Sequence, residues 1–120
     1  MTTLDADLIR RLAATTTIDL TTIGRRSGRP SRIEIWWFRV EDRFIISGTP
    51  GNRDWMANVR ANPKIVIHAA DGDFPGTATI VDDRAFRRRF FTHSDVNWYR
   101  TQSDLDLLVE TAPMIEISLS

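Results

Sequence analysis

Apolar and polar residues alternate with a period of two along much of the chain, which is typical of half-buried β-strands. The alternation predicts six strands, at residues 15–22, 31–40, 44–47, 65–69, 74–81 and 114–119. A hairpin with Glu41 and Asp42 at its tip joins the second strand to the third, and an Asp71-Gly72 turn joins the fourth to the fifth. The side chains expected to face a common core include Ile18, Leu20, Ile33, Ile35, Trp37, Ile115 and Ile117.

Three segments instead carry apolar residues at helical spacing. Residues 5–14 fit a short N-terminal helix with Asp5 as its cap. Residues 52–63 fit a second helix, in which Asn52 is the expected cap and Pro63 marks the end. The apolar stripe of this second helix consists of Trp55, Met56 and Val59.

The third helical segment, residues 82–91, is rich in arginine, and Arg87, Arg88 and Arg89 are expected on its solvated face. Residues 97–110 fit a loop or a weak helix. Six strands with about three short helices predict a mainly β protein, an antiparallel barrel closed by helical plugs. We expect one domain over residues 1–120, because a chain of 120 residues is long enough for one core and too short for two.

The composition excludes several kinds of chemistry. The chain has no cysteine, so disulfides, thiolate metal sites and cysteine nucleophiles are absent, and two histidines make a metal site unexpected. A formal net charge of zero argues against a nucleic-acid partner. No apolar run approaches the roughly twenty residues that span a bilayer, and the first residues do not form a signal peptide, so the expected location is the cytoplasm.

The charges are unevenly distributed along this neutral chain. Between Gly24 and Arg60, eight arginines stand against four carboxylates. The segment Gly24–Arg32 combines guanidinium groups with a glycine turn, and both complement phosphate or carboxylate oxygens. It is either an anion-binding site or a hairpin turn with solvated arginines. The segment Ser47–Trp55 is a second candidate, either a loop leading to helix amides that hold an anion or a plain strand-to-helix connection.

Aromatic and titratable residues offer fewer candidates. Trp36, Trp37 and Trp55 have the ring faces that pack against a planar ligand, although Trp37 is expected in the core. His68 fits a packed or surface histidine better than a general base. Tyr99 is the only tyrosine, and its hydroxyl could donate a proton to a substrate. The chain has no nucleophile elbow, phosphate loop or dinucleotide fingerprint, so any enzymatic chemistry would have to come from a cofactor.

Two stretches, TTIGRRSGRPSRIEIWWF and SGTPGNRDWMANVRANPKIVI, resemble the nitroreductase family of deazaflavin-dependent oxidoreductases. The resemblance covers Ile18 to about Val81 and implies an FMN-binding-like split β-barrel. It also implies a cytoplasmic reductase that transfers a hydride from reduced 8-hydroxy-5-deazaflavin (coenzyme F-420) to a small electron-poor acceptor such as a quinone, an enone or a nitro compound. Related split barrels often pair as homodimers. The alternatives are an FMN-binding protein or oxidase on the same fold and a non-catalytic binding module.

The resemblance also implies a set of site residues. By motif position, the phosphate region of the cofactor would contact Arg25, Arg26, Ser27 and Gly28, with Arg32 beside them. The ring and its polyol chain would lie near Trp36, Ser47, Trp55 and Asn58. Tyr99 is the expected catalytic residue, as a proton donor to the acceptor, and no metal is expected.

Overall fold

A computed structural model describes residues 5–70 and 72–120. The strands are β1 (Thr17–Ile23), β2 (Pro30–Val40), β3 (Arg43–Ser47), β4 (Lys64–Ala69), β5 (Gly72–Ile80) and β6 (Met114–Leu119). The helices are α1 (Ala6–Ala13), α2 (Asp54–Ala61), α3 (Arg84–Thr92), α4 (Asn97–Gln102) and α5 (Leu105–Thr111), with a 3-10 turn η1 (Ser94–Val96) before α4. None of the helices in these ranges is long and apolar enough to cross a membrane.

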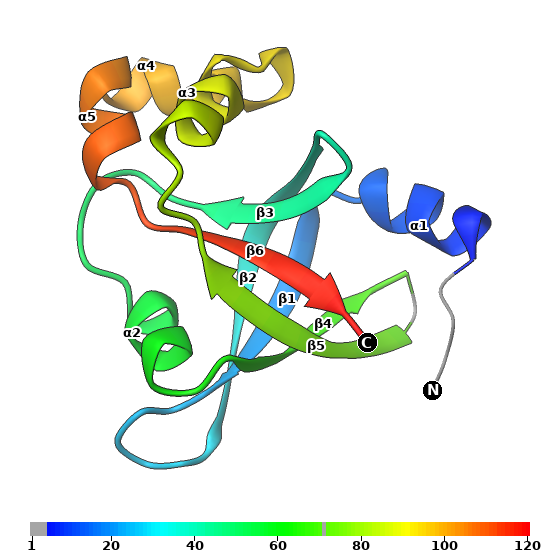
Figure 1. The fold of residues 1–120 in the computed structure, drawn as a ribbon. Coiled ribbons are helices and arrows are strands. Elements are labelled where there is room, and N and C mark those ends of the chain that lie inside the picture. Colours follow the sequence, from blue (N-terminus) through cyan, green and yellow to red (C-terminus); the bar gives the residue numbers. More distant parts are fainter. Residues whose placement is uncertain (1–4, 71) are drawn as a thin grey trace.

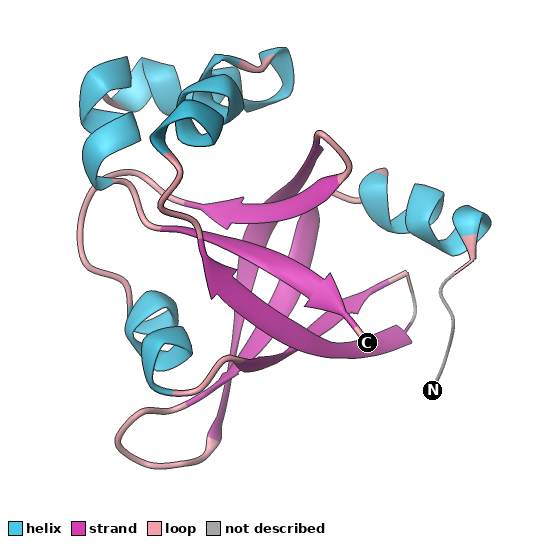
Figure 2. Cartoon of the chain, in the orientation of Figure 1, coloured by secondary structure: helices cyan, strands magenta, loops and turns pink. Residues whose placement is uncertain are grey.

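The six strands form a closed barrel in the order β1-β2-β3-β6-β5-β4, in which β4 pairs again with β1. Every pair is antiparallel, which confirms the mainly β, antiparallel architecture predicted from the alternation. Figure 1 shows three helical parts around the barrel: α1 at one side, α2 beside the other, and α3 to α5 as a layer above β3 and β6. Figure 2 shows a long loop from β3 to α2, whereas short connections join the other helices to the strands.

The period of two sets the register and fills the barrel. Ile18 is the partner of Ile35, and Leu20 is the partner of Ile33, so the apolar faces of β1 and β2 coincide. Trp37 is 1% exposed and stacks on Phe44 with 4.1 Å between the ring centroids. The inward residues predicted on β2 and β6 all belong to or pack against this core.

A second core lies outside the barrel, under the helical layer. Phe86, Phe90 and Phe91 of α3 pack there with Tyr99 and Leu108. Helices α4 and α5 therefore occupy most of the stretch expected to be loop or weak helix. They form because burial against α3 stabilises segments that are too short to be helical alone.

Two caps were predicted, and only one is correct. Asp5 caps α1, since its carboxylate accepts a hydrogen bond of 2.7 Å from the backbone N–H of Leu8. Asn52 does not cap α2. The helix begins at Asp54, and the backbone of Arg53 before it is still extended, so Asn52 lies outside the first turn.

Two turns between strands were predicted, at Glu41-Asp42 and at Asp71-Gly72. Glu41 and Asp42 form the tip between β2 and β3 as expected, with φ values of 53° and 60°. These left-handed angles match the twist of a tight hairpin. In the Asp71-Gly72 turn, Asp71 lies outside the described residues, and Gly72 is the first residue of β5.

Candidate functional site

The turn between β1 and β2 is held together by its own hydrogen bonds. The backbone N–H of Gly24 donates to the carbonyl of Arg29 at 2.8 Å, and that of Gly28 donates to the carbonyl of Gly24 at 2.9 Å. Ser27 Oγ accepts a hydrogen bond from the backbone N–H of Arg29 at 3.1 Å. Gly28 has φ of 70°, which favours glycine. This ordered turn exposes the side chains of Arg26 and Arg29.

A buried amide joins the turn to α2. Asn58 is 4% exposed, and its Oδ1 accepts hydrogen bonds from the backbone N–H of Arg25 at 3.1 Å and from the Arg25 guanidinium at 3.0 Å. Its Nδ2 donates to Thr22 Oγ1 at 3.0 Å. The Arg25 guanidinium also lies 3.3 Å from the Asp54 carboxylate. The structure thus brings Arg25 and Asn58 together and fixes the direction of the Arg25 side chain.

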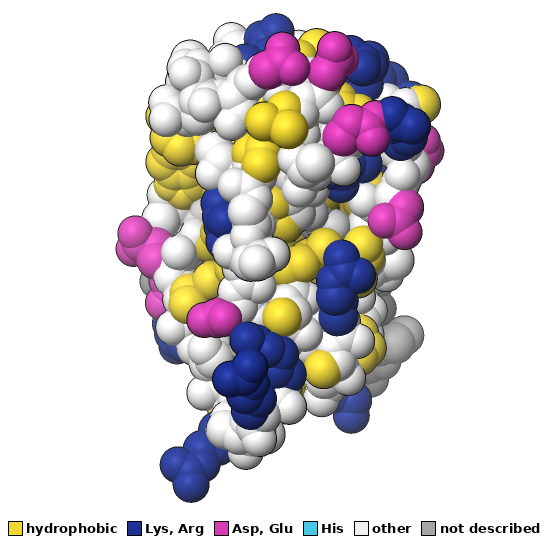
Figure 3. Space-filling view, turned by 90° about the vertical axis from the view of Figure 1, so that its left-hand side faces the viewer, with side chains coloured by type: hydrophobic (Ala, Val, Ile, Leu, Met, Phe, Trp, Pro, Cys, Tyr) yellow, Lys and Arg dark blue, Asp and Glu magenta, His cyan; other side chains and the backbone are white. Residues whose placement is uncertain are grey.

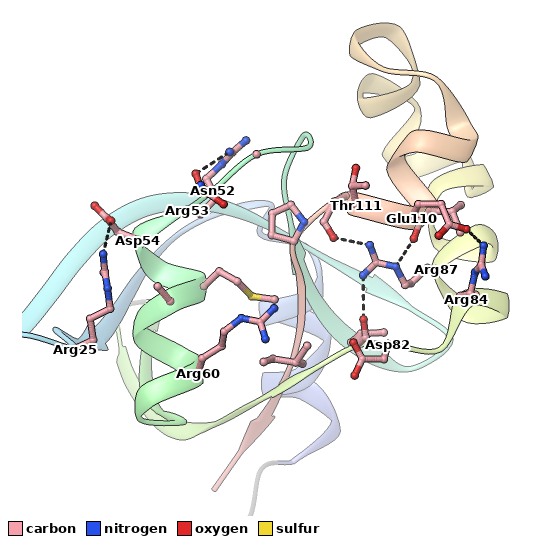
Figure 4. Close-up of a pocket in the computed structure, with 18 residues that line it drawn as sticks. Arg25, Asn52, Arg53, Asp54, Arg60, Asp82, Arg84, Arg87, Glu110 and Thr111 are labelled. Carbon is pink, nitrogen blue, oxygen red and sulfur yellow. Dashed lines mark hydrogen bonds and ion pairs between the residues drawn. The ribbon is translucent and has the colours of Figure 1, made fainter.

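A cleft of about 650 Å³ opens beside this junction, between α2 on one wall and the ends of β5, α3 and α5 on the other (Figure 4). Figure 3 shows the face that contains α2 and the β1–β2 turn, where basic side chains gather in the lower half and apolar side chains are visible among them. The residues that line the cleft are Arg25, Gly51, Asn52, Arg53, Asp54, Met56, Ala57, Arg60, Ile80, Val81, Asp82, Arg84, Arg87, Val109, Glu110, Thr111, Ala112 and Pro113.

The lining is basic, with five arginines against three carboxylates. Arg25 is paired with Asp54, and Arg84 is paired with Glu110. Arg53 donates to the carbonyl and the hydroxyl of Thr49, at 2.9 Å each. The remaining charged residues in the lining are Arg60, Asp82 and Arg87, and the cleft therefore keeps an excess of positive charge.

Arg87 is buried, which corrects the prediction that it lies on a solvated helix face. Its side chain is 7% exposed and donates to the carbonyls of Val109 at 2.6 Å, Val81 at 2.9 Å, Leu108 at 3.3 Å and Ala112. Burial lowers the pKa of the guanidinium. Arg88 and Arg89 are exposed as predicted and pair with Asp106 and Glu41. The burial of Arg87 was not predicted because most of its hydrogen-bond acceptors come from a distant part of the chain, residues 108–112.

Two predicted ring contacts, Ser47 and Trp55, are buried. Ser47 is 3% exposed, and its hydroxyl donates to the carbonyl of Pro113. Trp55 is 6% exposed and belongs to the barrel core. Neither residue is in the cleft lining, to which α2 contributes Met56 and Ala57.

Arg32 lies outside the cleft, on the outer face of the barrel. Its Nε lies 2.8 Å from the Asp19 carboxylate, and both residues line a second cavity of about 400 Å³. His68 lines this cavity too, with Nε2 2.7 Å from Thr21 Oγ1 and Nδ1 2.6 Å from Asp73 Oδ1. The histidine is thus packed between two partners. Among the described residues, no group of three potential ligands could hold a metal ion.

Trp36 and Tyr99 each contact Trp98 and are also outside the cleft lining. Trp36 is 39% exposed, and its ring centroid is 5.4 Å from that of Trp98. Tyr99 is next to Trp98 and packs edge-on against Phe38 and Phe91. Burial raises the pKa of Tyr99 to about 12, so its hydroxyl stays protonated at neutral pH.

The chain is similar to known proteins in sequence and in fold. A family model described as F420H(2)-dependent quinone reductase matches residues 1–111. No curated protein sequence matches. Among solved structures, the conserved hypothetical protein Rv2991 from Mycobacterium tuberculosis is 16% identical with a TM-score of 0.74, covering 99% of this chain and 82% of the other.

Two further solved structures share the fold. A putative pyridoxamine 5'-phosphate oxidase from Listeria innocua is 13% identical with a TM-score of 0.70, covering 95% of this chain and 91% of the other. A structure described as an F420-H2 dependent reductase is 18% identical with a TM-score of 0.65, covering 86% of this chain and 94% of the other. These similarities confirm the FMN-binding-like split barrel.

Proposed function

Because the chain belongs to the family of F420H(2)-dependent quinone reductases, we propose that it binds reduced coenzyme F-420 in the cleft beside α2 and transfers a hydride to a small electron-poor acceptor. Quinones, enones and nitro compounds are the proposed acceptors. The observation that supports the proposal most strongly is the junction at the cleft, where the buried side chain of Asn58 holds Arg25 against α2.

The residues of the cleft fit a deazaflavin in charge and in size. A volume of about 650 Å³ is in the range of small-molecule sites. Met56, Ala57, Ile80 and Pro113 provide apolar surface for a fused ring. The β1–β2 turn provides exposed guanidinium groups for a phosphate. When bound, the cofactor supplies the hydride, so the chain needs no nucleophile of its own.

The proposed role of the protein is to hold the phosphate of the cofactor and to orient its ring. Asn58 restricts Arg25, which therefore loses little side-chain entropy when it meets an anion. The ion pair of Arg25 with Asp54 joins the turn to the first turn of α2, so an anion bound at the turn also fixes the position of the helix. Met56 lies on that same helix and would pack against the ring. The geometry of ring and phosphate is thus set by one element.

A titration followed by single-turnover oxidation tests the proposal. Purified protein is titrated with coenzyme F-420 and, separately, with FMN, and binding is followed by tryptophan fluorescence. The reduced complex is then mixed with menadione. We expect micromolar binding of the deazaflavin and oxidation above the rate without protein. Binding of FMN alone would support an FMN protein on this fold, and binding of neither cofactor would support the non-catalytic binding module.

Replacing Arg26 by alanine is expected to weaken cofactor binding by about 1–3 kcal/mol, because a charge-assisted contact to the phosphate is lost. Arg26 is exposed in the ordered turn, so the free energy of unfolding should hardly change. The measurement is the same titration at low and high salt. Arg10→Ala on α1 is the matched control, since Arg10 is an exposed arginine outside the cleft. Equal affinities for both variants would indicate that the arginines of the turn are only solvated.

Tyr99 is kept as the proposed proton donor to the acceptor, and in the structure it is buried outside the cleft lining. Tyr99→Phe is expected to leave cofactor affinity nearly intact and to slow single-turnover oxidation by menadione. Equal oxidation rates for the two proteins would exclude Tyr99 from the reaction.

The raised pKa of Tyr99 also predicts how stability depends on pH. The contribution of the buried, protonated hydroxyl to the free energy of unfolding is complete below pH 10.0 and is lost as the pH rises toward about 12. Because Tyr99 is the only tyrosine, its tyrosinate absorbance can be titrated directly.

The proposal includes a homodimer in the cytoplasm. Support for the dimer comes from Trp36 and Trp98, two large apolar side chains that are 39% and 47% exposed and lie against each other. Sedimentation of the purified protein over a range of concentrations measures its oligomeric state. A monomer at every concentration would contradict the proposed dimer.

A further inference from the structure

Arg60 is the cleft arginine with no partner among the described residues. It lies in the last turn of α2, is exposed, and projects from the helix into the cleft (Figure 4). The structure gives it neither a hydrogen bond nor an ion pair with any residue in the ranges 5–70 and 72–120. By contrast, Arg53 and Arg84 each have a polar partner, and Arg25 is held at the turn by Asn58 and Asp54. Arg60 is therefore available to a ligand.

The opposite wall adds to the positive potential at Arg60. Arg87 lies in that wall, and its four hydrogen bonds go to neutral carbonyls, so no carboxylate is in contact with its charge. Glu110 is already paired with Arg84, and Asp82 is the remaining carboxylate of the lining. Two cations thus face one anion at this end of the cleft. In a partly buried site such an imbalance attracts negative charge more strongly than on an open surface.

The position of Arg60 relative to the rest of the cleft indicates what kind of anion it meets. Arg25 contacts Asp54 and Asn58, which share one face of α2, whereas Arg60 lies one turn after Met56 on the same face as that side chain. If the turn holds the phosphate, the ring lies along the middle of the helix, and Arg60 is on the ring side. An anionic group beside Arg60 would therefore lie near the cofactor ring and the acceptor, where the reaction takes place.

Resting on the proposed function, we infer that Arg60 is a catalytic residue that stabilises the oxyanion formed on a conjugated carbonyl acceptor. Hydride addition breaks the C–H bond of the reduced cofactor and forms a C–H bond at the conjugated carbon of the acceptor. The electron pair of the acceptor double bond moves to its carbonyl oxygen, which becomes an enolate. The guanidinium hydrogen-bonds to this oxygen, which is then protonated by the proposed donor Tyr99 or, if Tyr99→Phe reacts at the wild-type rate, by water. The acceptor is reduced by two electrons and the cofactor is oxidised by two.

An anionic quinone that resembles the enolate tests this role without turnover. The probe is 2-hydroxy-1,4-naphthoquinone, whose hydroxyl ionises below neutral pH, and its neutral counterpart is 2-methoxy-1,4-naphthoquinone. Each is titrated calorimetrically into the protein loaded with oxidised coenzyme F-420. We expect the hydroxy compound to bind the wild type more tightly, and Arg60→Met to weaken its binding about tenfold while the methoxy compound is unaffected. Arg60→Lys should restore part of the affinity, and Arg10→Met should change nothing.

The ionisation of the bound probe gives a second readout. Its coloured anion is followed against pH, and the apparent pKa of the bound hydroxyl should be lower on the wild type than on Arg60→Met. Equal pKa values, or equal affinities of Arg60→Met and wild type for the anion, would overturn the inference. Failure of the proposed function is seen separately, as absence of cofactor binding in the loading step. Loaded protein with unchanged probe binding therefore rejects the role of Arg60 alone.

Discussion

Replacing Arg87 by methionine is expected to lower the free energy of unfolding by about 3–5 kcal/mol. Methionine keeps the apolar stem of the side chain but removes every hydrogen bond of the guanidinium. Four carbonyls, those of Val81, Leu108, Val109 and Ala112, lose a charged donor in a buried place. A hydrogen bond to a charged group contributes about 1.5–3 kcal/mol, and an unsatisfied buried acceptor costs about 1–3 kcal/mol, although water entering from the cleft would reduce the total.

Chemical denaturation followed by circular dichroism measures this loss. The matched control is Arg88→Met, because Arg88 is the next residue on α3, is exposed, and pairs with Asp106 on the surface. Such a pair contributes about 0–1 kcal/mol. If both variants lose the same stability, Arg87 is solvated in the protein and does not make its four hydrogen bonds to backbone carbonyls. A loss confined to Arg87→Met would confirm that this side chain fastens α5 to the barrel.

Replacing Trp55 by alanine is expected to cost about 3–5 kcal/mol of stability, as for other large aromatic side chains removed from a core. Trp55 is 6% exposed and packs inside the barrel with residues of several strands. Its truncation leaves a cavity between α2 and the barrel. Trp55→Phe, which keeps most of the volume, should cost much less. Thermal or chemical unfolding of the two variants gives the comparison.

The cofactor affinity of Trp55→Phe, compared with that of Met56→Ala, distinguishes a core role for Trp55 from the ring contact implied by the sequence. Met56 is its neighbour on α2, lines the cleft, and is only partly buried. We expect Met56→Ala to reduce cofactor affinity with a small loss of stability, and Trp55→Phe to leave affinity nearly intact. If Trp55→Phe loses affinity as Met56→Ala does, with stability preserved, then Trp55 contacts the ring directly.

The barrel could be predicted from the sequence because strand alternation depends only on near neighbours. Thr17–Ile23 and Pro30–Val40 carry apolar residues at every second position, and their register follows from matching those faces. The same rule explains why two predicted site residues miss the cleft. Arg32 and Trp36 share the outer face of β2, so a pattern that places Trp37 in the core also directs them away from the interior.

The second wall of the cleft could not be predicted in this way. Its residues come from the end of β5, from α3 and from the segment after α5, which are far apart in the sequence. Arg87 gave no sign of burial, because its neighbours Arg88 and Arg89 are also arginines and its four acceptors are backbone atoms. Arg60 was within the basic stretch but could not be distinguished from its solvated neighbours until the opposite wall was known.

The position of β6 between β3 and β5 has a consequence for how the protein is made. Strands β1 to β5 emerge from the ribosome first, and together they form a sheet that still has two open edges, on β3 and on β5. Unpaired edges of this kind can join another nascent chain. Only when residues 114–119 are available can the ladder close, by contacts such as Phe44 with Ile117 that span more than half of the chain. The last strand to be synthesised therefore completes the barrel on both sides at once.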